Sequence, residues 1–483
     1  MLLGLDLGTT NIKALVVRPD GTIAAEGAAP VQLIHTSDGG VEQNIEEIWQ
    51  STLRAIRQAG EKTDLAAVRA VGISSQGGAI QIRDQHDRCL GPVISWLDSR
   101  GQPCDEQLTH ELGKAWFTQR IGHPGSAVAV GQILRLRAAD PKLVAWPNRV
   151  GFVGDAIVCR LTGRAAHDCS SLSICNLYNP AKHQADTDLL QRVGLKSEQL
   201  PDLLPARQSV GGLRPEVAKQ LSLKAGIPVS PAVHDQYAAA LGCGALRSGD
   251  VMFGAGTAWV LLAAADRLMP PVGAVAWVCD HIVPGRWGQL VSLIVGGSVF
   301  RWVCDLTRTT GTSSAELDDL LESVSPGSEG LKLYPFLDGT GGPHRLPAGT
   351  IDGIRLAHGV THLLRAAVEG LCFELARQLD WLNKAGCPTS RLIMCGGVTG
   401  TRVTPQIVAD VTHRPVACPA QPEISAFGAA ILARAILEPD APLEQLADAM
   451  SPPTRVLEPG PNASAYKPLL AEYVDRVSRL ARI

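Results

Sequence analysis

Short apolar runs and turn-forming residues alternate through the first part of the chain. Apolar runs predict three strands, at residues 2–7, 12–17 and 22–26, which are separated by a Gly8-Thr9-Thr10 turn and a Pro-Asp-Gly turn. An i, i+3, i+4 stripe from Ile45 to Ile56 then predicts a helix, with Asn44 as its N-cap and Glu47 as the capping-box partner. A further apolar run at residues 68–73 predicts another strand. The order β-β-β-α-β predicts an α/β domain with a mixed sheet.

A similar pattern recurs in the second half of the chain. Residues 250–262 predict a strand, a Gly-Thr turn and a second strand. A long amphipathic helix is predicted at 360–381, and further elements follow: a strand at 391–395, a helix at 404–410, a strand at 415–416 and a helix at 425–435. We therefore predict two related α/β halves, with an N-terminal domain at 1–244 and a C-terminal domain at 245–440. A Pro-rich linker and a final helix at 466–483 complete the chain within 441–483.

Charge and composition exclude several classes of protein. Lys and Arg number 44 and Asp and Glu number 47, a net charge of −3, so there is no basic excess for nucleic acid and no polybasic patch for a membrane. The longest apolar run, residues 251–265, is too short to span a bilayer. Because the N-terminus lacks a signal-peptide pattern and the 12 cysteines form no C-x-x-C pair, we expect reduced thiols and a cytoplasmic location.

The two predicted Gly-Thr turns have the chemistry of phosphate-binding loops. In the first turn, Gly8 lets the backbone approach an anion, and Thr9 and Thr10 supply hydroxyl and N–H groups. Asp6 at the strand end is suited to Mg²⁺, and Lys13 adds a positive charge. The second turn, residues 254–257, has the same character. Either turn alone fits an ordinary hairpin equally well, but their recurrence in matched positions favours two loops that grip a polyphosphate.

Six stretches, in order along nearly the whole chain, resemble the FGGY carbohydrate kinases of the actin-like ATPase superfamily. They include GLDLGTTNIKALVV at the N-terminus, VGISSQGGAIQIRD followed by GPVISWLDSR, LTGRAAHDCSSLS, VSPAVHDQYAAALGCG, SLIVGGSVFRWVCD and CGGVTGTRVTPQIVADVTHRPV. The resemblance implies two actin-like, ribonuclease-H-like α/β domains with the active site in the cleft between them. It also implies ATP as phosphate donor, Mg²⁺ as cofactor and a small sugar or polyol as substrate. Members of the family often dimerise, which leaves a homodimer open, and no helix pattern marks an interface.

By this resemblance the general base is Asp235, which also joins Asp6 as a Mg²⁺ ligand. A carboxylate is too weak a base to ionise an alcohol beforehand, so it accepts the proton late in phosphoryl transfer. The alternative role for Asp235 is an N-cap for a helix at 236–241. The neighbouring His234 is not expected to take part, because on a strand it points to the opposite face.

Further site residues follow from the turn chemistry and from the resemblance. The residues predicted to bind the nucleotide are Thr9, Thr10, Lys13, Gly256, Thr257, Gly297, Gly396, Gly397 and Thr401. Two positions depart from the family pattern: Ala258 stands where a serine is usual, and Val398 where a third glycine is usual. The nucleotide pocket is therefore expected to differ in detail.

The predicted acceptor site combines a loop after the fourth strand with the surroundings of the base. Its residues are Gln76, Gly77, Gly78, Trp96, Asp98, Asp235 and Gln236. By resemblance, xylulokinases carry Met-His and glycerol kinases Arg-Glu at the positions of Gly77-Gly78. One interpretation is that the two glycines merely turn the chain. The functional interpretation predicts a cavity that is enlarged, or one rebuilt by water or side chains from elsewhere. Trp96 fits stacking on sugar carbons and core packing equally well.

We therefore predict ATP-dependent phosphorylation of a terminal hydroxyl of a small sugar, with a ketopentose such as xylulose as the leading acceptor. Ribulose, glycerol and erythritol are the alternative acceptors. A catalytically silent, nucleotide-gated sugar-binding protein is disfavoured because Asp6 and Asp235 are both present. An actin- or chaperone-type ATPase is disfavoured by the loop that carries Trp96.

Overall fold

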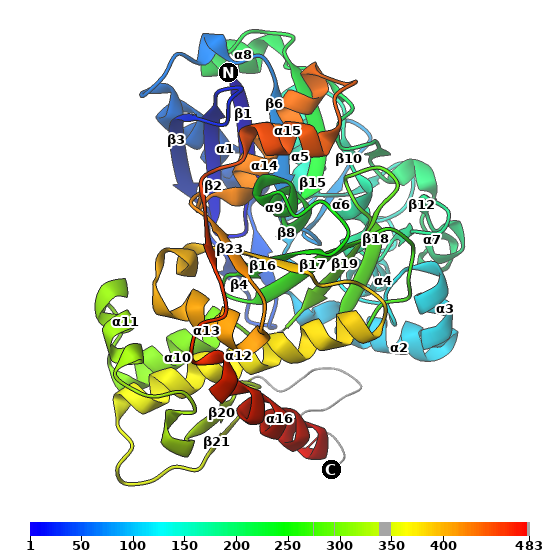
Figure 1. Ribbon diagram of the computed structural model, residues 1–483. Helices are drawn as coiled ribbons and strands as arrows, with labels where there is room; N and C mark the ends of the chain where they lie inside the picture. Colours follow the sequence, from blue (N-terminus) through cyan, green and yellow to red (C-terminus); the bar gives the residue numbers. More distant parts are fainter. Residues whose placement is uncertain (274, 294, 338–348, 481–483) are drawn as a thin grey trace.

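A computed structural model describes the chain except residues 274, 294, 338–348 and 481–483, and it shows two large mixed sheets (Figure 1). The first sheet has the order β13-β10-β15-β6-β1-β2-β3, with β14 paired to β15. Its strands are β1 (Leu2–Leu7), β2 (Asn11–Val17), β3 (Ile23–Pro30), β6 (Val71–Ser75), β10 (Ala166–His167), β13 (Asp202–Leu203), β14 (Gly211–Gly212) and β15 (Pro228–His234). β2 is antiparallel to β1 and β3, whereas β6 is parallel to β1 and β15. All of β6 and nearly all of β1 is buried, as the apolar runs require.

The second sheet repeats this arrangement in the order β18-β19-β17-β16-β22-β23-β24. Its strands are β16 (Asp250–Ala255), β17 (Trp259–Ala265), β18 (Ala276–Asp280), β19 (Trp287–Ser292), β22 (Arg391–Cys395), β23 (Val416–Pro419) and β24 (Thr454–Leu457). Like β1, the strand β16 pairs antiparallel with the next strand and parallel with a later one. The predicted pair of related α/β halves is therefore confirmed.

A third, smaller sheet carries the loops beside the first phosphate-type turn. It has the order β4-β5-β8-β7-β9, with bounds β4 (Ile34–His35), β5 (Val41–Gln43), β7 (Ile80–Arg83), β8 (Val93–Ile94) and β9 (Arg149–Phe152). Helix α1 (Ile45–Gly60) follows β5 and covers β2 and β3. Asn44 caps α1 as predicted, by accepting from the Glu46 amide at 2.8 Å. The predicted capping box is wrong, because Glu47 accepts from the Gln32 backbone instead.

Two helices cross between the halves and place the candidate site. Helix α9 (Asp235–Cys243) packs on α14 (Ile424–Leu437), and α14 lies against β1 and β6 although it comes from the C-terminal half. The helices touch through their backbones: a Cβ at Gly428 would lie 1.8 Å from the Ala238 carbonyl oxygen. Only glycine permits this approach. The start of α9 is thereby fixed against both sheets.

The remaining helices surround the sheets, and several of them pack mainly on other helices. In the N-terminal half they are α2 (Gln102–Leu112), α3 (Lys114–Arg120), α4 (Ala129–Ala139), α5 (Val153–Thr162), α6 (Cys169–Ile174), α7 (Thr187–Val193) and α8 (Pro215–Leu221). In the C-terminal half they are α10 (Gly297–Thr307), α11 (Ser314–Glu322), α12 (Val360–Lys384), α13 (Val403–Thr412), α15 (Leu443–Met450) and α16 (Ala463–Leu480). The short strands β11 (Tyr178–Asn179) and β12 (Gln184–Ala185) pair with each other, as do β20 (Lys332–Tyr334) and β21 (Thr350–Asp352).

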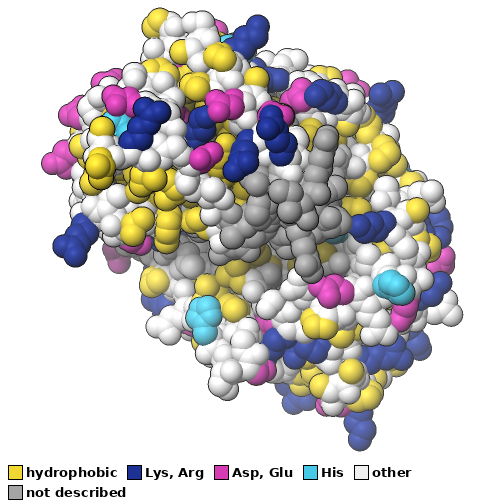
Figure 2. Space-filling model, turned by 90° about the horizontal axis from the view of Figure 1, so that it is seen from below, with side chains coloured by type: hydrophobic (Ala, Val, Ile, Leu, Met, Phe, Trp, Pro, Cys, Tyr) yellow, Lys and Arg dark blue, Asp and Glu magenta, His cyan; other side chains and the backbone are white. Residues whose placement is uncertain are grey.

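The last forty residues form a strand and a helix that pack on the C-terminal half. β24 extends the second sheet by pairing with β23, and α16 packs on α12 and α13. The predicted end of the final helix at residue 483 lies outside the described residues. None of the helices that the structure describes is both long enough and apolar enough to cross a membrane. Figure 2 shows basic and acidic side chains interspersed over one face, in keeping with the small net charge.

Candidate active site

Asp6 lies at the end of β1, beside the first Gly-Thr turn. Its Oδ1 accepts a hydrogen bond from the Ser74 hydroxyl of β6 at 2.8 Å, and Lys13 stands opposite it in the β1–β2 register. Burial, and then the nearby charge of Asp235, raise the pKa of Asp6 to about 6, while the bond from Ser74 and the charge of Lys13 oppose that rise. The two carboxylates therefore lie close enough to feel each other's charge.

Asp235 is the first residue of α9, directly after β15. The alternative that it caps the helix is wrong, because His234 occupies the N-cap position and no side chain makes a capping bond there. The Gln236 amide donates to Asp235 Oδ1 at 3.2 Å. Burial raises the pKa of Asp235 to about 6, and the hydrogen bonds from Gln236 oppose this rise.

His234 lies in contact with Asp235, which corrects the expectation that it points away. Its Nε2 is 3.2 Å from Asp235 Oδ1. Strand alternation fails here because the chain leaves β15 at His234 and turns at once into α9. Burial lowers the pKa of His234 to about 3, so its ring is neutral near pH 7.

The first turn is tied to the acceptor loop by a chain of hydrogen bonds. Thr9 Oγ1 donates to Gln76 Oε1 at 3.2 Å and accepts from Trp96 Nε1 at 3.0 Å. Gln43 Nε2 donates to the Thr9 carbonyl at 2.7 Å, and Gln76 Nε2 donates to Gln43 Oε1 at 3.0 Å. Gln76 is buried and both ends of its amide have protein partners. The structure therefore joins Thr9, Gln76 and Trp96 in one network.

The other predicted residues at the first turn are Thr10, which is exposed, and Lys13, which contacts the C-terminal half. Thr10 is exposed, and its backbone carbonyl accepts from Val31 at 2.8 Å. Lys13 forms an ion pair with Glu423, the residue before α14. This pair connects the first sheet to a segment more than four hundred positions away.

The second turn and the start of α10 lie against each other. The Gly297 amide donates to the Gly256 carbonyl, and the Ser298 amide to the Thr257 carbonyl, both at 3.0 Å. The turn also lies beside the base, since a Cβ at Gly254 would come within 3.3 Å of Gln236 Oε1. Gly256, Thr257 and Gly297 are thus brought together next to α9.

The glycine pair after β22 adjoins the second turn. A Cβ at Gly396 would lie 2.8 Å from the Ala255 carbonyl oxygen, and its φ of 111° favours glycine. Gly397 has open space at its Cβ position. Thr401 ends the short helical turn after Gly397, where its hydroxyl donates to the Val398 carbonyl at 2.8 Å.

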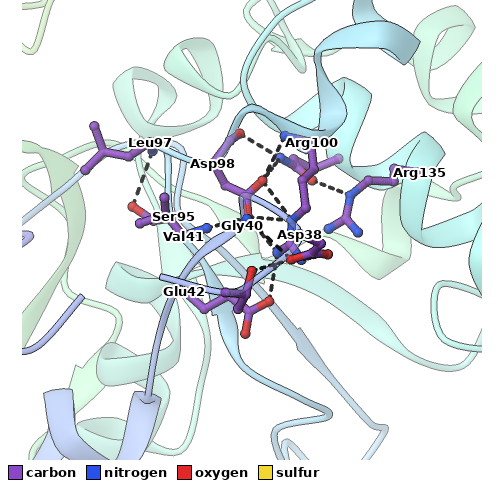
Figure 3. Close-up of polar contacts among 11 residues, drawn as sticks. Asp38, Gly40, Val41, Glu42, Ser95, Leu97, Asp98, Arg100 and Arg135 are labelled. Atoms are coloured by element: carbon purple, nitrogen blue, oxygen red, sulfur yellow. Dashed lines mark hydrogen bonds and ion pairs between the residues drawn. The ribbon is translucent and has the colours of Figure 1, made fainter. Parts of the chain in front are cut away.

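Trp96 is 47% exposed, so the core-packing alternative is wrong. Asp98, two residues later, caps a short helical turn and is buried (Figure 3). Its Oδ2 accepts from the Val41 amide at 2.9 Å, and its Oδ1 accepts from the Arg100 amide at 2.9 Å. Arg100 also reaches Asp38 and Glu42, at 2.8 Å and 2.7 Å. This network fixes the backbone of the loop that presents Trp96.

The space beside Gly77 and Gly78 is filled by other parts of the chain. A Cβ at Gly77 would lie 2.5 Å from His234 Cδ2 and 2.6 Å from Ile174 Cγ2. A Cβ at Gly78 would lie 2.3 Å from Val128 Cγ1. The cavity beside the two glycines measures ≈ 10 Å³, room for about one water molecule. Of the two predicted outcomes, the structure shows rebuilding by side chains from elsewhere, not enlargement.

Several residues of this region were missed from the sequence: Gln43, Ser74, Glu423 and the role of His234. Gln43, Ser74 and Glu423 are polar and meet the site only through the fold, so local spacing gives no signal for them. His234 stands next to Asp235 in the sequence, but it was predicted to point away. The one available signal was the position of Ser74 in an apolar strand next to β1, where a buried hydroxyl needs a partner.

Comparisons with known proteins agree with this geometry. Residues 1–242 match the N-terminal domain of the FGGY family of carbohydrate kinases, and residues 251–436 match the C-terminal domain of the same family. The chain is 27% identical to a xylulose kinase of Escherichia coli (strain K12), covering 97% of this chain and 96% of that protein. It is 29% identical to a glycerol kinase of Polaromonas naphthalenivorans (strain CJ2), covering 89% and 90%.

A crystal structure of a "xyloylose kinase" from Brucella ovis superposes with a TM-score of 0.90 at 25% identity, over 99% of both chains. Two lobes with matching sheets and carboxylates at the ends of β1 and β15 therefore belong to a sugar-kinase fold. The chain belongs to the FGGY family of carbohydrate kinases, phosphotransferases that act on sugar or polyol hydroxyls and use ATP as donor.

Proposed function

We propose that this kinase transfers the γ-phosphoryl group of ATP to a terminal hydroxyl of a ketopentose such as xylulose, with Asp235 as general base. The observation that carries the proposal is the placement of Asp6 and Asp235. These two carboxylates lie within each other's field, beside one Gly-Thr turn from each half. The similarity to xylulose kinases over nearly the full length supports a ketopentose as the first acceptor to test.

The proton acceptor is the free oxygen of Asp235. Oδ1 already accepts from the Gln236 side chain, whereas no side chain in the described part of the chain donates to Oδ2. With a pKa of about 6, the carboxylate is ionised at neutral pH and is a better base than an exposed aspartate. It takes the hydroxyl proton as the new O–P bond forms, so most of the catalysis comes from alignment of the hydroxyl with the phosphoryl group.

Phosphate binding is assigned to the two turns and the N-terminus of α10. We assign the phosphates to the exposed Thr10 and to the backbone around Thr257, which accepts from the Ser298 amide. Lys13 supplies positive charge near the first turn. Gly396, Gly397 and Thr401 are assigned to the adenosine end, together with Gly297. The open space at Gly397 gives a flat purine ring room to lie on the backbone.

The residues present fit a Mg²⁺ ion. Asp6 uses Oδ1 for Ser74, and its Oδ2 faces the turn, where it lies 3.9 Å from the Cβ position of Gly8. Within the described ranges no cluster of three or more His, Cys, Asp or Glu forms a metal site. Two carboxylates suit Mg²⁺ nevertheless, since this ion keeps several water ligands. We propose that Asp6 and Asp235 hold it, directly or through water, and that when bound it neutralises phosphate charge.

The acceptor site takes a neutral polyhydroxyl compound. The exposed face of Trp96 offers an apolar surface to sugar carbons, held in place by its bond to Thr9. Arg100 is occupied by three carboxylates, so it is not free to pair with a sugar acid. We assign Asp98 to holding the Trp96 loop, because both of its oxygens already have protein donors. Gln76 holds the loop in the same way. We assign Gln236 to the acceptor site because its amide donates to Asp235.

A coupled ADP-release assay tests the proposal. Purified enzyme with MgATP is offered D-xylulose, D-ribulose, glycerol, erythritol and gluconate, each against a no-acceptor blank. We expect D-xylulose to give the highest kcat/KM and the Asp235→Asn variant to lose this turnover. Asp266→Asn, an exposed carboxylate at the far end of β17, is the matched control and keeps wild-type rates. Acceptor-independent ADP release across the whole panel would refute the proposal.

A further inference from the structure

His234 has an unusual position for a side chain with no expected role. Its ring is buried, it stands one residue before the proposed base, and its Nε2 lies 3.2 Å from Asp235 Oδ1. The backbone at His234 is itself fixed, because its amide donates to Ser170 Oγ at 3.1 Å and Ser170 donates to Asp168 at 2.7 Å. The imidazole therefore approaches the carboxylate from a rigid support.

The chemistry of the two groups decides the direction of the contact. Asp235 Oδ1 can only accept when the carboxylate is ionised, so a favourable contact at 3.2 Å requires a hydrogen on Nε2. The other nitrogen, Nδ1, is then an acceptor, and it is buried without a hydrogen-bond partner among the described residues. A buried nitrogen without a hydrogen-bond partner lowers stability, which argues that the ring is held there for its other nitrogen.

The contact also gives the two oxygens of Asp235 different surroundings. Gln236 Nε2 and His234 Nε2 both lie 3.2 Å from Oδ1 and approach it from the two sequence neighbours of Asp235. With the Gln236 amide bonded to Oδ1 and the imidazole edge beside the same oxygen, the rotation of the carboxylate is restricted and Oδ2 lies on the other side. Oδ2 is thereby presented to the acceptor hydroxyl.

Gly77 is the counterpart that makes room for this ring. Any Cβ at position 77 would lie 2.5 Å from His234 Cδ2 and 2.7 Å from its Nε2. A side chain at 77 and an imidazole at 234 therefore exclude each other. The loop glycine and the histidine before the base form one unit, although 157 positions separate them.

We propose that His234 is a positioning residue, which donates its Nε2 hydrogen to Asp235 Oδ1 and holds Oδ2 toward the acceptor, and that Gly77 is required because it leaves space for this ring. The inference rests on the proposed role of Asp235. It predicts that the donor matters for turnover and that ring volume alone does not.

Two variants of similar size distinguish a hydrogen-bonding role of His234 from a role in filling space. His234→Gln keeps an N–H donor near the position of Nε2, and His234→Leu fills the space without one. For the best acceptor of the panel, we expect His234→Leu to lower kcat by at least ~10-fold with the KM for ATP within about twofold of wild type. We expect His234→Gln to recover kcat to within about threefold of wild type. A purely structural role predicts the reverse order, because leucine suits a buried apolar site better. Wild-type kcat in His234→Leu, or Gln as slow as Leu, overturns the proposal.

The glycine is tested with its own control. Gly77→Ala is expected to displace the imidazole and lower kcat at least as far as His234→Leu does. Gly211→Ala is the matched control, since its Cβ would meet only Thr162 at an ordinary 3.8 Å. Wild-type kcat in Gly77→Ala overturns the proposed unit.

A measurement on the unmodified enzyme does not depend on how the variants fold. Long-range ¹⁵N–¹H correlation on histidine-labelled protein at pH 7.5 reports the tautomer of each ring, and the spectrum of His234→Gln identifies the His234 signals. The proposal predicts a hydrogen on Nε2, and an Nδ1–H tautomer overturns it. If the wild-type enzyme turns over no acceptor while the ring is Nε2–H, the proposed function fails but the contact with Asp235 stands.

Discussion

Replacing Asp235 by asparagine tests two consequences of burying this carboxylate: the ionised group lowers the stability of the fold, and it acts as the base in phosphoryl transfer. The side chain is 28% exposed, and its pKa is raised from 3.8 to about 6, mainly by burial. A raised pKa means that the folded state holds the proton more tightly than the unfolded state. The ionised carboxylate therefore destabilises the fold at every pH above about 6, and this cost disappears as the pH falls through 3.8.

The size of the effect follows from the shift. Two pKa units correspond to ~3 kcal/mol at pH 7.5, and partial exposure to solvent reduces this toward ~1 kcal/mol. The cost is roughly halved at pH 5 and nearly absent at pH 4. Asparagine has the same shape, keeps an oxygen that accepts from Gln236, and carries no charge. It also removes the charge that raises the pKa of Asp6.

We therefore expect Asp235→Asn to be more stable and inactive. Its melting temperature at pH 7.5 should rise by roughly 1–3 °C, and the gain should shrink at pH 5. Its kcat should fall by ~10²–10⁴-fold, the usual contribution of a general base. Calorimetry at the two pH values and the ADP-release assay measure both. A lower melting temperature at pH 7.5, or turnover near the wild-type rate, would refute the reasoning.

Four further outcomes are expected. The wild-type kcat should fall as the pH drops below about 6, since Asp235 must be ionised to accept a proton, and a flat profile from pH 5 to 8 would contradict this. Trp96→Phe loses the bond to Thr9 and should raise the KM for the acceptor by ~3–10-fold at an unchanged KM for ATP, whereas equal changes in both would count against the assigned site. Gly428→Ala forces a Cβ to within 1.8 Å of the Ala238 oxygen and should lower the free energy of unfolding by ~1–3 kcal/mol in urea titration; an unchanged midpoint would show that the helix crossing is not tight. Chelation of Mg²⁺ should stop turnover, and Asp6→Asn should raise the Mg²⁺ concentration for half-maximal rate, a result that an unaffected titration would rule out.

Local patterns in the sequence predicted the individual strands and helices that bury a continuous apolar face. β1 and β22 have the predicted bounds, and the long amphipathic stripe of α12 was found with its start at the right residue. The recurrence of a Gly-Thr turn between two apolar runs led to the two related halves. Hydrophobic periodicity is sufficient here because each element buries a continuous face against a neighbour.

The missed features all depend on contacts between distant segments. β24 was read as linker because four residues after two prolines carry little strand signal, and only the edge of β23 gives them a partner. Glu47 was expected in a capping box, but the backbone of Gln32 competes for it. His234 was placed on the wrong side because strand alternation was extended past the point where α9 begins.

The site shows the same division. Asp6 and Asp235 could be named because each ends a strand in a recognisable motif. The bonds that hold the acceptor loop could not, since Thr9, Gln43, Gln76 and Trp96 come from four separate segments. Glycines at 77 and 78 suggested extra space, whereas the fold brings His234 and Val128 into that space.

The central claim is that this chain makes a sugar phosphate at a terminal hydroxyl and uses Asp235 to do so. The most direct test is ³¹P NMR of a reaction that contains enzyme, MgATP and D-xylulose. The account predicts ADP together with a new phosphate monoester signal split into a triplet by the two protons of a terminal CH₂, and no such signal with Asp235→Asn. ADP accompanied only by inorganic phosphate, or the same ester from the Asp235→Asn variant at an undiminished rate, would contradict it.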